Sequence, residues 1–159
     1  MKRIIALLLT LMVVLSLCAC GGDSSTAATN EVLQGHSWGE TGNESRSIGD
    51  ASSFYGLSVK SVYYKGNDWD GKLYKIEYTF EPTEENAEEL EKICSEKLNM
   101  PPVEKEYKDG PYEGYSWHNT WYDGSIEYVF YYVDTVYENG SYRETNHWLR
   151  LEIENDIYK

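Results

Sequence analysis

Two short glycine corners, Asp123-Gly124 and Asn139-Gly140, constrain the fold of this 159-residue chain more than any other feature. They separate three stretches in which apolar and polar residues alternate, which is the pattern of half-buried β-strands. An Asp-Gly or Asn-Gly pair between such stretches favours a hairpin with a two-residue type I′ turn. We therefore expect the C-terminal part of the chain to form a three-stranded antiparallel meander.

The two turns also assign every side chain of the meander to a face of the sheet, because side chains alternate along a strand. With these turns, Tyr131 is expected opposite Trp148, and Tyr137 opposite Tyr142. One face then holds the core residues Tyr115, Trp117, Trp121, Ile126, Tyr128, Phe130, Leu149, Leu151 and Ile153. The opposite face holds Ser116, His118, Thr120, Val129, Tyr131, Val133, Tyr137, Tyr142, Asn146, Trp148 and Arg150.

The preceding residues supply two more strands and a helix. Residues 57–64 and 73–80 have strand patterns, and the second alternates Tyr and Ile with charged residues. Thr83 is a favourable helix N-cap, and the apolar stripe Ala87, Leu90, Ile93, Cys94 and Leu98 repeats at helical spacing up to Asn99. Residues 103–111 are expected to be a charged loop. The sequence thus predicts an α+β domain in which one antiparallel sheet of about five strands, in the order ββαβββ, carries one helix on one face.

The N-terminus has the pattern of an export signal. Lys2 and Arg3 precede an apolar run from Ile4 to Leu17, which is shorter than the roughly 20 residues that a spanning helix needs. Leu17-Cys18-Ala19-Cys20 resembles the lipobox of bacterial lipoproteins. That resemblance implies a signal peptide over residues 1–19, lipidation of Cys20, and attachment to the cell membrane on its extracytoplasmic side. A secreted protein with an incidental cysteine is the alternative.

Residues 20–53 are rich in Gly, Ser, Thr, Asn and acidic residues and have almost no apolar periodicity. This composition predicts a flexible polar linker between the anchor and a domain over residues 54–159. After processing, Cys94 would be alone in the mature domain, so we expect no internal disulfide.

Composition and charge exclude several classes of function. The chain is 41% hydrophobic and 14% aromatic, so it has ample material for a folded core. Its formal charge of -13 disfavours nucleic acids and acidic substrates as partners. We find no signature of a phosphate-binding loop, a zinc site or a hydrolase, and we expect no cofactor and no metal. GNDWDG, with Asp68, Asp70 and Gly71, partly matches a calcium loop, but a hairpin turn is the simpler interpretation.

The open face of the predicted sheet is the first candidate site. Its aromatic strip, bordered by charged and polar residues, offers stacking surface for a protein, peptide or glycan partner. The site residues are Tyr131, Trp148, Tyr137, Tyr142, Arg150 and His118. We therefore expect a non-enzymatic binding module of the cell envelope, although the same aromatic pairs would also serve simply to stabilise the sheet.

The covered face offers an alternative of a different class. There Cys94 points inward from the helix, His147 is expected opposite Tyr132, and Asp134 is its diagonal neighbour. A thiol, an imidazole and a carboxylate in contact would make an envelope cysteine hydrolase or transferase. A cysteine in an apolar helical stripe is more often a small core residue, so thiol accessibility separates the two hypotheses.

Overall fold

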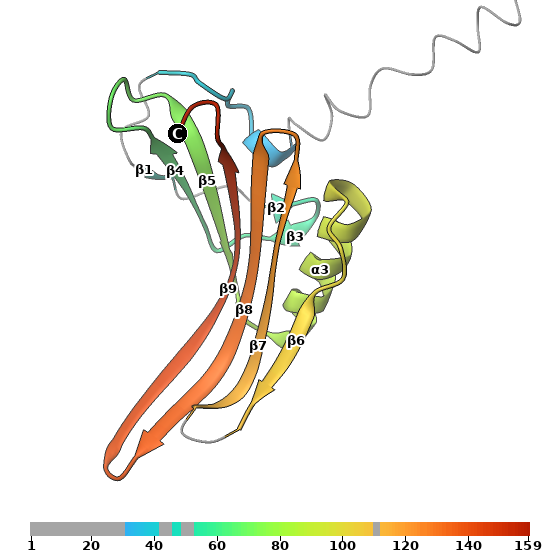
Figure 1. Ribbon diagram of the computed structural model, residues 1–159, viewed down its shortest axis with the longest axis vertical. Coiled ribbons are helices and arrows are strands. Elements are labelled where there is room, and N and C mark those ends of the chain that lie inside the picture. The colour runs from blue at the N-terminus through green and yellow to red at the C-terminus, as the bar shows by residue number, and fades with distance from the viewer. Residues whose placement is uncertain (1–30, 42–45, 49–52, 110–111) are drawn as a thin grey trace, which may run out of the picture.

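The computed structural model of the protein describes residues 31–41, 46–48, 53–109 and 112–159. Its main element is a seven-stranded antiparallel sheet in the order β1-β4-β5-β9-β8-β7-β6, accompanied by a two-stranded β2-β3 hairpin and the helix α3 (Figure 1). The α+β class and the antiparallel sheet are confirmed. The bounds are β1 Arg46–Ile48, β2 Ser53–Phe54, β3 Leu57–Ser58, β4 Ser61–Gly66, β5 Leu73–Phe80, α3 Glu84–Leu98, β6 Glu104–Lys108, β7 Tyr112–Asp123, β8 Ile126–Asn139 and β9 Tyr142–Asn155.

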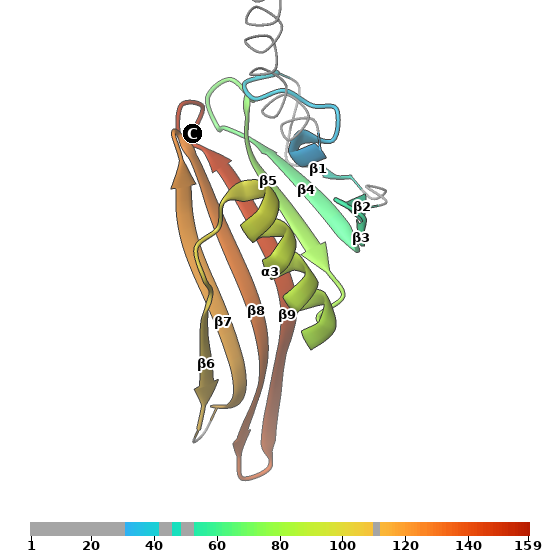
Figure 2. The same cartoon turned by 90° about the vertical axis from the view of Figure 1, so that its right-hand side faces the viewer.

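Helix α3 begins and ends where its sequence indicates. The Thr83 side chain accepts a hydrogen bond from the Asn86 backbone N–H, and Asn99 closes the helix in the left-handed conformation. Its five apolar residues are all buried and belong to one hydrophobic core with the sheet. The helix therefore covers one face of the sheet, as expected (Figure 2).

The two glycine corners form hairpins, but the turns lie one residue later than expected. Asp123 pairs with Ile126, and Asn139 pairs with Tyr142, so the turn residues are Gly-Ser in both hairpins. Gly124 and Gly140 have φ values of 60° and 62°. The serines that follow, Ser125 and Ser141, do not have positive φ, and a positive φ at the first turn position alone is the type II′ arrangement. The expected type I′ turns were wrong because glycine, the residue that adopts positive φ without strain, occupies the first place.

The expected strand register is corrected by two residues as a result. Tyr128 lies opposite Ile153 rather than Leu151, and Tyr131 lies opposite Arg150 rather than Trp148. A shift of two leaves every side chain on its expected face, because the strand repeat is two residues. Most of the predicted core face is buried, including Trp117, Trp121 and Phe130, but Tyr115 is 45% exposed and its prediction as a core residue was wrong.

A further strand replaces the expected charged loop. Glu104–Lys108 forms β6, which pairs with β7 at one edge of the sheet. All five residues of β6 are exposed, so the strand has no apolar alternation by which to recognise it. The order ββαβββ is therefore wrong, since four strands rather than three follow the helix.

Part of the expected linker packs on the domain. Val32 and Leu33 are buried in the core, and the Tyr78 hydroxyl donates a 2.6 Å hydrogen bond to the Val32 carbonyl. Arg46–Ile48 forms β1, which pairs with β4. These contacts correct the prediction of a flexible linker through residue 53, because two apolar residues suffice to dock a polar segment. The predicted signal peptide, residues 1–19, and Cys20 lie outside the described residues.

The helix covers only part of its face of the sheet. At 15 residues it is about 22 Å long, whereas β8 and β9, at 14 residues each, span about 46 Å. Figures 1 and 2 show the β8–β9 hairpin continuing well past the helix. We call the part of the sheet beyond the helix the distal half. Among the described residues, no helix has the length and hydrophobicity required to cross a bilayer.

Candidate functional site

The predicted aromatic strip on the open face separates into two groups. In the first, the His118 and Tyr131 rings lie 4.9 Å apart between centroids, and the Tyr131 and Trp148 rings lie 5.6 Å apart. The Arg150 guanidinium lies 5.2 Å from the centre of the Trp148 ring. These four residues form a continuous cluster over β7, β8 and β9, which we call the aromatic block.

Tyr137 and Tyr142 form the second group, close to the turn of the β8–β9 hairpin. Their ring centroids are 5.9 Å apart, although Tyr137 pairs directly with Glu144. Tyr137 lies six residues along β8 from Tyr131, a separation of about 20 Å. The structure therefore does not join this tip pair to the aromatic block.

A hollow of about 360 Å³ adjoins the aromatic block on the same face. Trp148 and Val133 form its apolar part, and hydroxyl, amide and ammonium groups complete it. The lining residues are Lys108, Ser116, Val133, Thr135, Asn146 and Trp148. Lys108 belongs to β6, a strand that the sequence pattern did not predict, so Lys108 was not among the predicted site residues. The polar lining residues lie at alternate positions along their strands, as the other residues of the open face do. That alternation is the sequence signal by which they could have been identified.

Charged side chains on the neighbouring strands neutralise one another. Arg150 makes ion pairs with Glu77 at 3.3 Å and with Glu152 at 3.1 Å, and Lys75 bridges Glu152 and Glu154. Burial raises the pKa of Tyr131 above its ordinary value, so its phenol is a neutral hydrogen-bonding group at physiological pH. The aromatic block is therefore flanked by compensated charges and offers no isolated ion to a ligand.

The alternative catalytic group does not assemble. Cys94 is fully buried, and burial raises the pKa of its thiol well above the usual range. The thiol belongs to the same buried core as Tyr128, which lies six residues, or about 20 Å, along β8 from Asp134. His147 is exposed and pairs directly with Asp134, rather than with Tyr132 as expected. The imidazole and the carboxylate are thus neighbours on the distal half, while the thiol is enclosed in the core.

The loop that partly matches a calcium site is organised as a turn. The Asn67 side chain accepts a hydrogen bond from the Asp70 N–H, and Asp70 accepts one from the Lys72 N–H and pairs with the Lys72 ammonium at 2.6 Å. Within the described ranges, no three His, Cys, Asp or Glu side chains are placed to hold a metal ion. Asp70 thus serves the turn geometry, which is the role of Asp in such loops.

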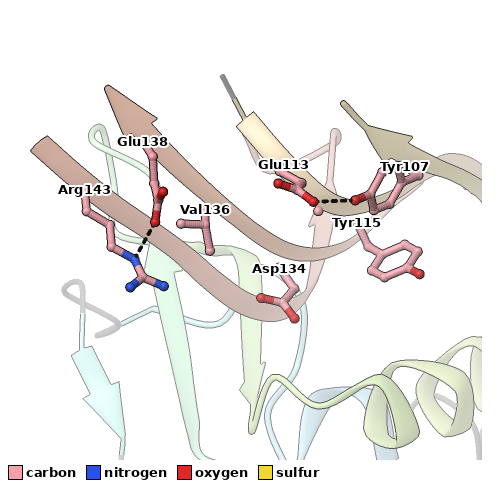
Figure 3. Close-up of a pocket in the computed structure, with 8 residues that line it drawn as sticks. Tyr107, Glu113, Tyr115, Asp134, Val136, Glu138 and Arg143 are labelled. Carbon is pink, nitrogen blue, oxygen red and sulfur yellow. Dashed lines mark hydrogen bonds and ion pairs between the residues drawn. The ribbon is translucent and has the colours of Figure 1, made fainter. Parts of the chain in front are cut away.

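A second hollow, which sequence reasoning missed, lies on the helix side of the distal half. It measures about 470 Å³ and is shown in Figure 3. One cross-strand row there consists of Tyr107, Tyr115, Asp134 and His147, and it lies next to the row that holds the buried Trp117 and Tyr132. The residues lining this hollow are Tyr107, Glu113, Gly114, Tyr115, Asp134, Val136, Glu138 and Arg143. We call it the distal pocket.

No protein-family model matches the chain, and the searches of curated proteins and of solved structures found nothing similar to it. Function must therefore be argued from the two hollows themselves.

Proposed function

We propose that this protein is a lipid-anchored, non-enzymatic binding module of the bacterial cell envelope, and that the open face of its sheet contacts a glycan. The observation that carries the proposal is the hollow beside Trp148. It combines an aromatic ring with hydroxyl and amide groups on a face that the helix leaves uncovered. Small-ligand sites usually combine an apolar surface with a few polar groups.

The chemistry of the lining favours a glycan over the protein and peptide partners that remained open from sequence. Sugar rings present an apolar face for stacking on an indole and hydroxyls for hydrogen bonding. Ser116, Thr135 and Asn146 supply neutral donors and acceptors, and Lys108 is the one charged group of the lining. The charges around Arg150 are already paired, so Lys108 is the single charge of the site with which a charged peptide could be recognised.

The anchor would orient this face with respect to the membrane. Ten residues separate Cys20 from Glu31, which is the first residue of the described segment, and they span at most about 40 Å. Figure 1 shows residues 31–41 at the opposite end of the molecule from the β8–β9 turn. A lipid on Cys20 would therefore hold the N-terminal end close to the bilayer and direct the distal half away from it. Replacing Cys20 with serine should release the protein from the membrane fraction.

Co-sedimentation with purified, insoluble cell-wall glycan tests the binding proposal. We expect Trp148→Ala to weaken retention about tenfold or more, because truncation of a central aromatic anchor commonly costs over 2 kcal/mol. Tyr131→Ala should act in the same direction through the loss of its contact with Trp148.

Trp69→Ala is the matched control. Trp69 is 93% exposed and lies in the β4–β5 loop, away from the open-face hollow. Its replacement removes the same surface indole without touching the site. Equal retention of wild type, Trp148→Ala and Trp69→Ala would reject the open face as the binding surface, and no retention of any of them would reject the glycan.

A further inference from the structure

The distal pocket is built from aromatic rings and carboxylates in a fixed arrangement. The Tyr107 and Tyr115 rings meet edge to face, with centroids 5.2 Å apart and planes at 67°. Their strands pair directly at these two residues, and Asp134 follows Tyr115 in the same cross-strand row. Figure 3 shows the two rings on one side of the pocket, with the Asp134 carboxylate beside Tyr115.

The charges within the pocket are not balanced. Glu138 is paired with Arg143 at 3.4 Å, which accounts for one acid and the one base among the lining residues. Glu113 accepts a 3.0 Å hydrogen bond from the Tyr107 hydroxyl, a contact that leaves its negative charge in place. Within the described ranges, the Asp134 carboxylate has neither a hydrogen bond nor an ion pair. Two carboxylates therefore remain beside two exposed tyrosine rings, with His147 as the facing titratable neighbour of Asp134.

From this arrangement we infer that the distal pocket binds an organic cation that carries ammonium groups. The face of a tyrosine ring attracts a cation through its quadrupole, and a carboxylate adds a charge-assisted hydrogen bond. An alkylammonium ligand uses both, since its methylene groups pack against the rings and Val136 while its charged ends reach the acids. The pocket volume of about 470 Å³ suits a small ligand of this class.

The same features disfavour an inorganic cation as the ligand. A divalent metal requires several oxygen ligands within about 2–2.6 Å, and the described residues hold no group of three candidate ligands. Aromatic walls contribute nothing to such a site. The formal charge of -13 raises the local concentration of any cation, so steering by the whole protein accompanies the local recognition. This inference is independent of the open face, which lies on the other side of the sheet.

Calorimetric titration of the full-length protein in non-ionic detergent with spermidine tests the inference. About 0.1 M sodium chloride, which gives a Debye length of about 10 Å, suppresses non-specific attraction to the acidic surface. We expect saturable binding that weakens about tenfold in Asp134→Asn and in Tyr115→Leu. Asp134→Asn preserves the shape of the side chain, so it carries the test if Tyr115→Leu does not fold.

Tyr122 and Glu127 provide a matched control. The Tyr122 hydroxyl donates a 2.7 Å hydrogen bond to Glu127, which reproduces the Tyr107–Glu113 pair, but these residues line neither of the two hollows. Tyr122→Leu and Glu127→Gln should bind spermidine as the wild type does. The inference is overturned if spermidine does not bind, if sodium or calcium at equal ionic strength displaces it fully, or if all four variants weaken binding equally.

Discussion

Replacing Tyr78 with phenylalanine tests whether residues 31–33 are part of the folded domain. The Tyr78 hydroxyl is buried and hydrogen-bonds to the Val32 carbonyl, so burial raises the pKa of this phenol and keeps it a donor. The substitution retains the ring and its contact with Phe54, at 4.8 Å between centroids. It removes only the donor and leaves the Val32 carbonyl without that partner.

The expected loss of stability follows from these contacts. A buried group left without its partner costs about 1–3 kcal/mol, so we expect Tyr78→Phe to lower the free energy of unfolding by about 1–2 kcal/mol. At a urea m value of about 2 kcal/mol/M, the midpoint of unfolding falls by about 0.5–1 M. Because the same bond fastens the N-terminal segment, a glutamate-specific protease should also cut after Glu31 faster than in the wild type.

Tyr63→Phe is the control for this measurement. Tyr63 lies on the adjacent strand β4, one residue from Tyr64 and on the opposite face of the sheet from Tyr78. Its replacement should change the free energy of unfolding by less than about 0.5 kcal/mol. If Tyr78→Phe matches this control in both urea unfolding and proteolysis, residues 31–33 do not contribute to the domain.

Three further perturbations probe the backbone glycines and the core. In a urea titration, Gly124→Ala should lower the free energy of unfolding by about 1 kcal/mol, because alanine is strained at a φ of 60°. Gly114→Ala should lower it by about 3 kcal/mol or more, because the added methyl group would collide with the Asp134 backbone oxygen, and equal stabilities of the two variants would contradict this ranking. The Cys94 thiol should react with a thiol reagent, followed by mass spectrometry of its peptide, only after denaturant is added, and rapid labelling of the native protein would revive the catalytic alternative. Burial raises the pKa of Tyr64 and of Tyr128 to about 12, so above pH 10 the unfolded chain loses protons that the folded chain retains. The free energy of unfolding should therefore fall by about 1 kcal/mol per tyrosine by about pH 11. A free energy of unfolding that does not change between about pH 10 and about pH 11 in chemical denaturation would refute this.

The faces of the sheet were predictable even though the pairing was not. Glycine appears second in both Asp123-Gly124 and Asn139-Gly140, and the sequence alone does not decide whether it takes the second place of one turn or the first place of the next. The two choices differ by two residues in register. Since side chains alternate with a period of two, Phe130 and Trp148 keep their faces under either choice.

The edge strand and the docked N-terminal segment were missed for a shared reason. A buried helix or strand face can be predicted from sequence because its apolar residues recur periodically. Glu104–Lys108 is exposed throughout, and Val32 and Leu33 are only two apolar residues within a polar stretch. Neither segment produces a period that can be detected, although both are held by backbone pairing or by a few tertiary contacts.

The separation of Cys94 from Asp134 and His147 could have been predicted by comparing the lengths of the predicted helix and strands. The predicted faces correctly place Asp134 and His147 on the side of the sheet that carries the helix, which is why the sequence suggests that they lie near Cys94. A helix from Thr83 to Asn99 is about half as long as the strands of the meander. It cannot cover the whole face, so residues near the hairpin turn, such as Asp134, are left uncovered and separate from the buried thiol.

The exposed, charged β6 has a consequence for crowding on a surface. With the proposed lipid anchor, copies of this protein would meet edge to edge far more often than in solution, and an open sheet margin favours their joining into ribbons. Four of the five residues of Glu104–Lys108 are charged, and they would place ionic groups wherever a second chain tried to align. That margin would keep neighbouring molecules apart, so that each one presents its two hollows separately.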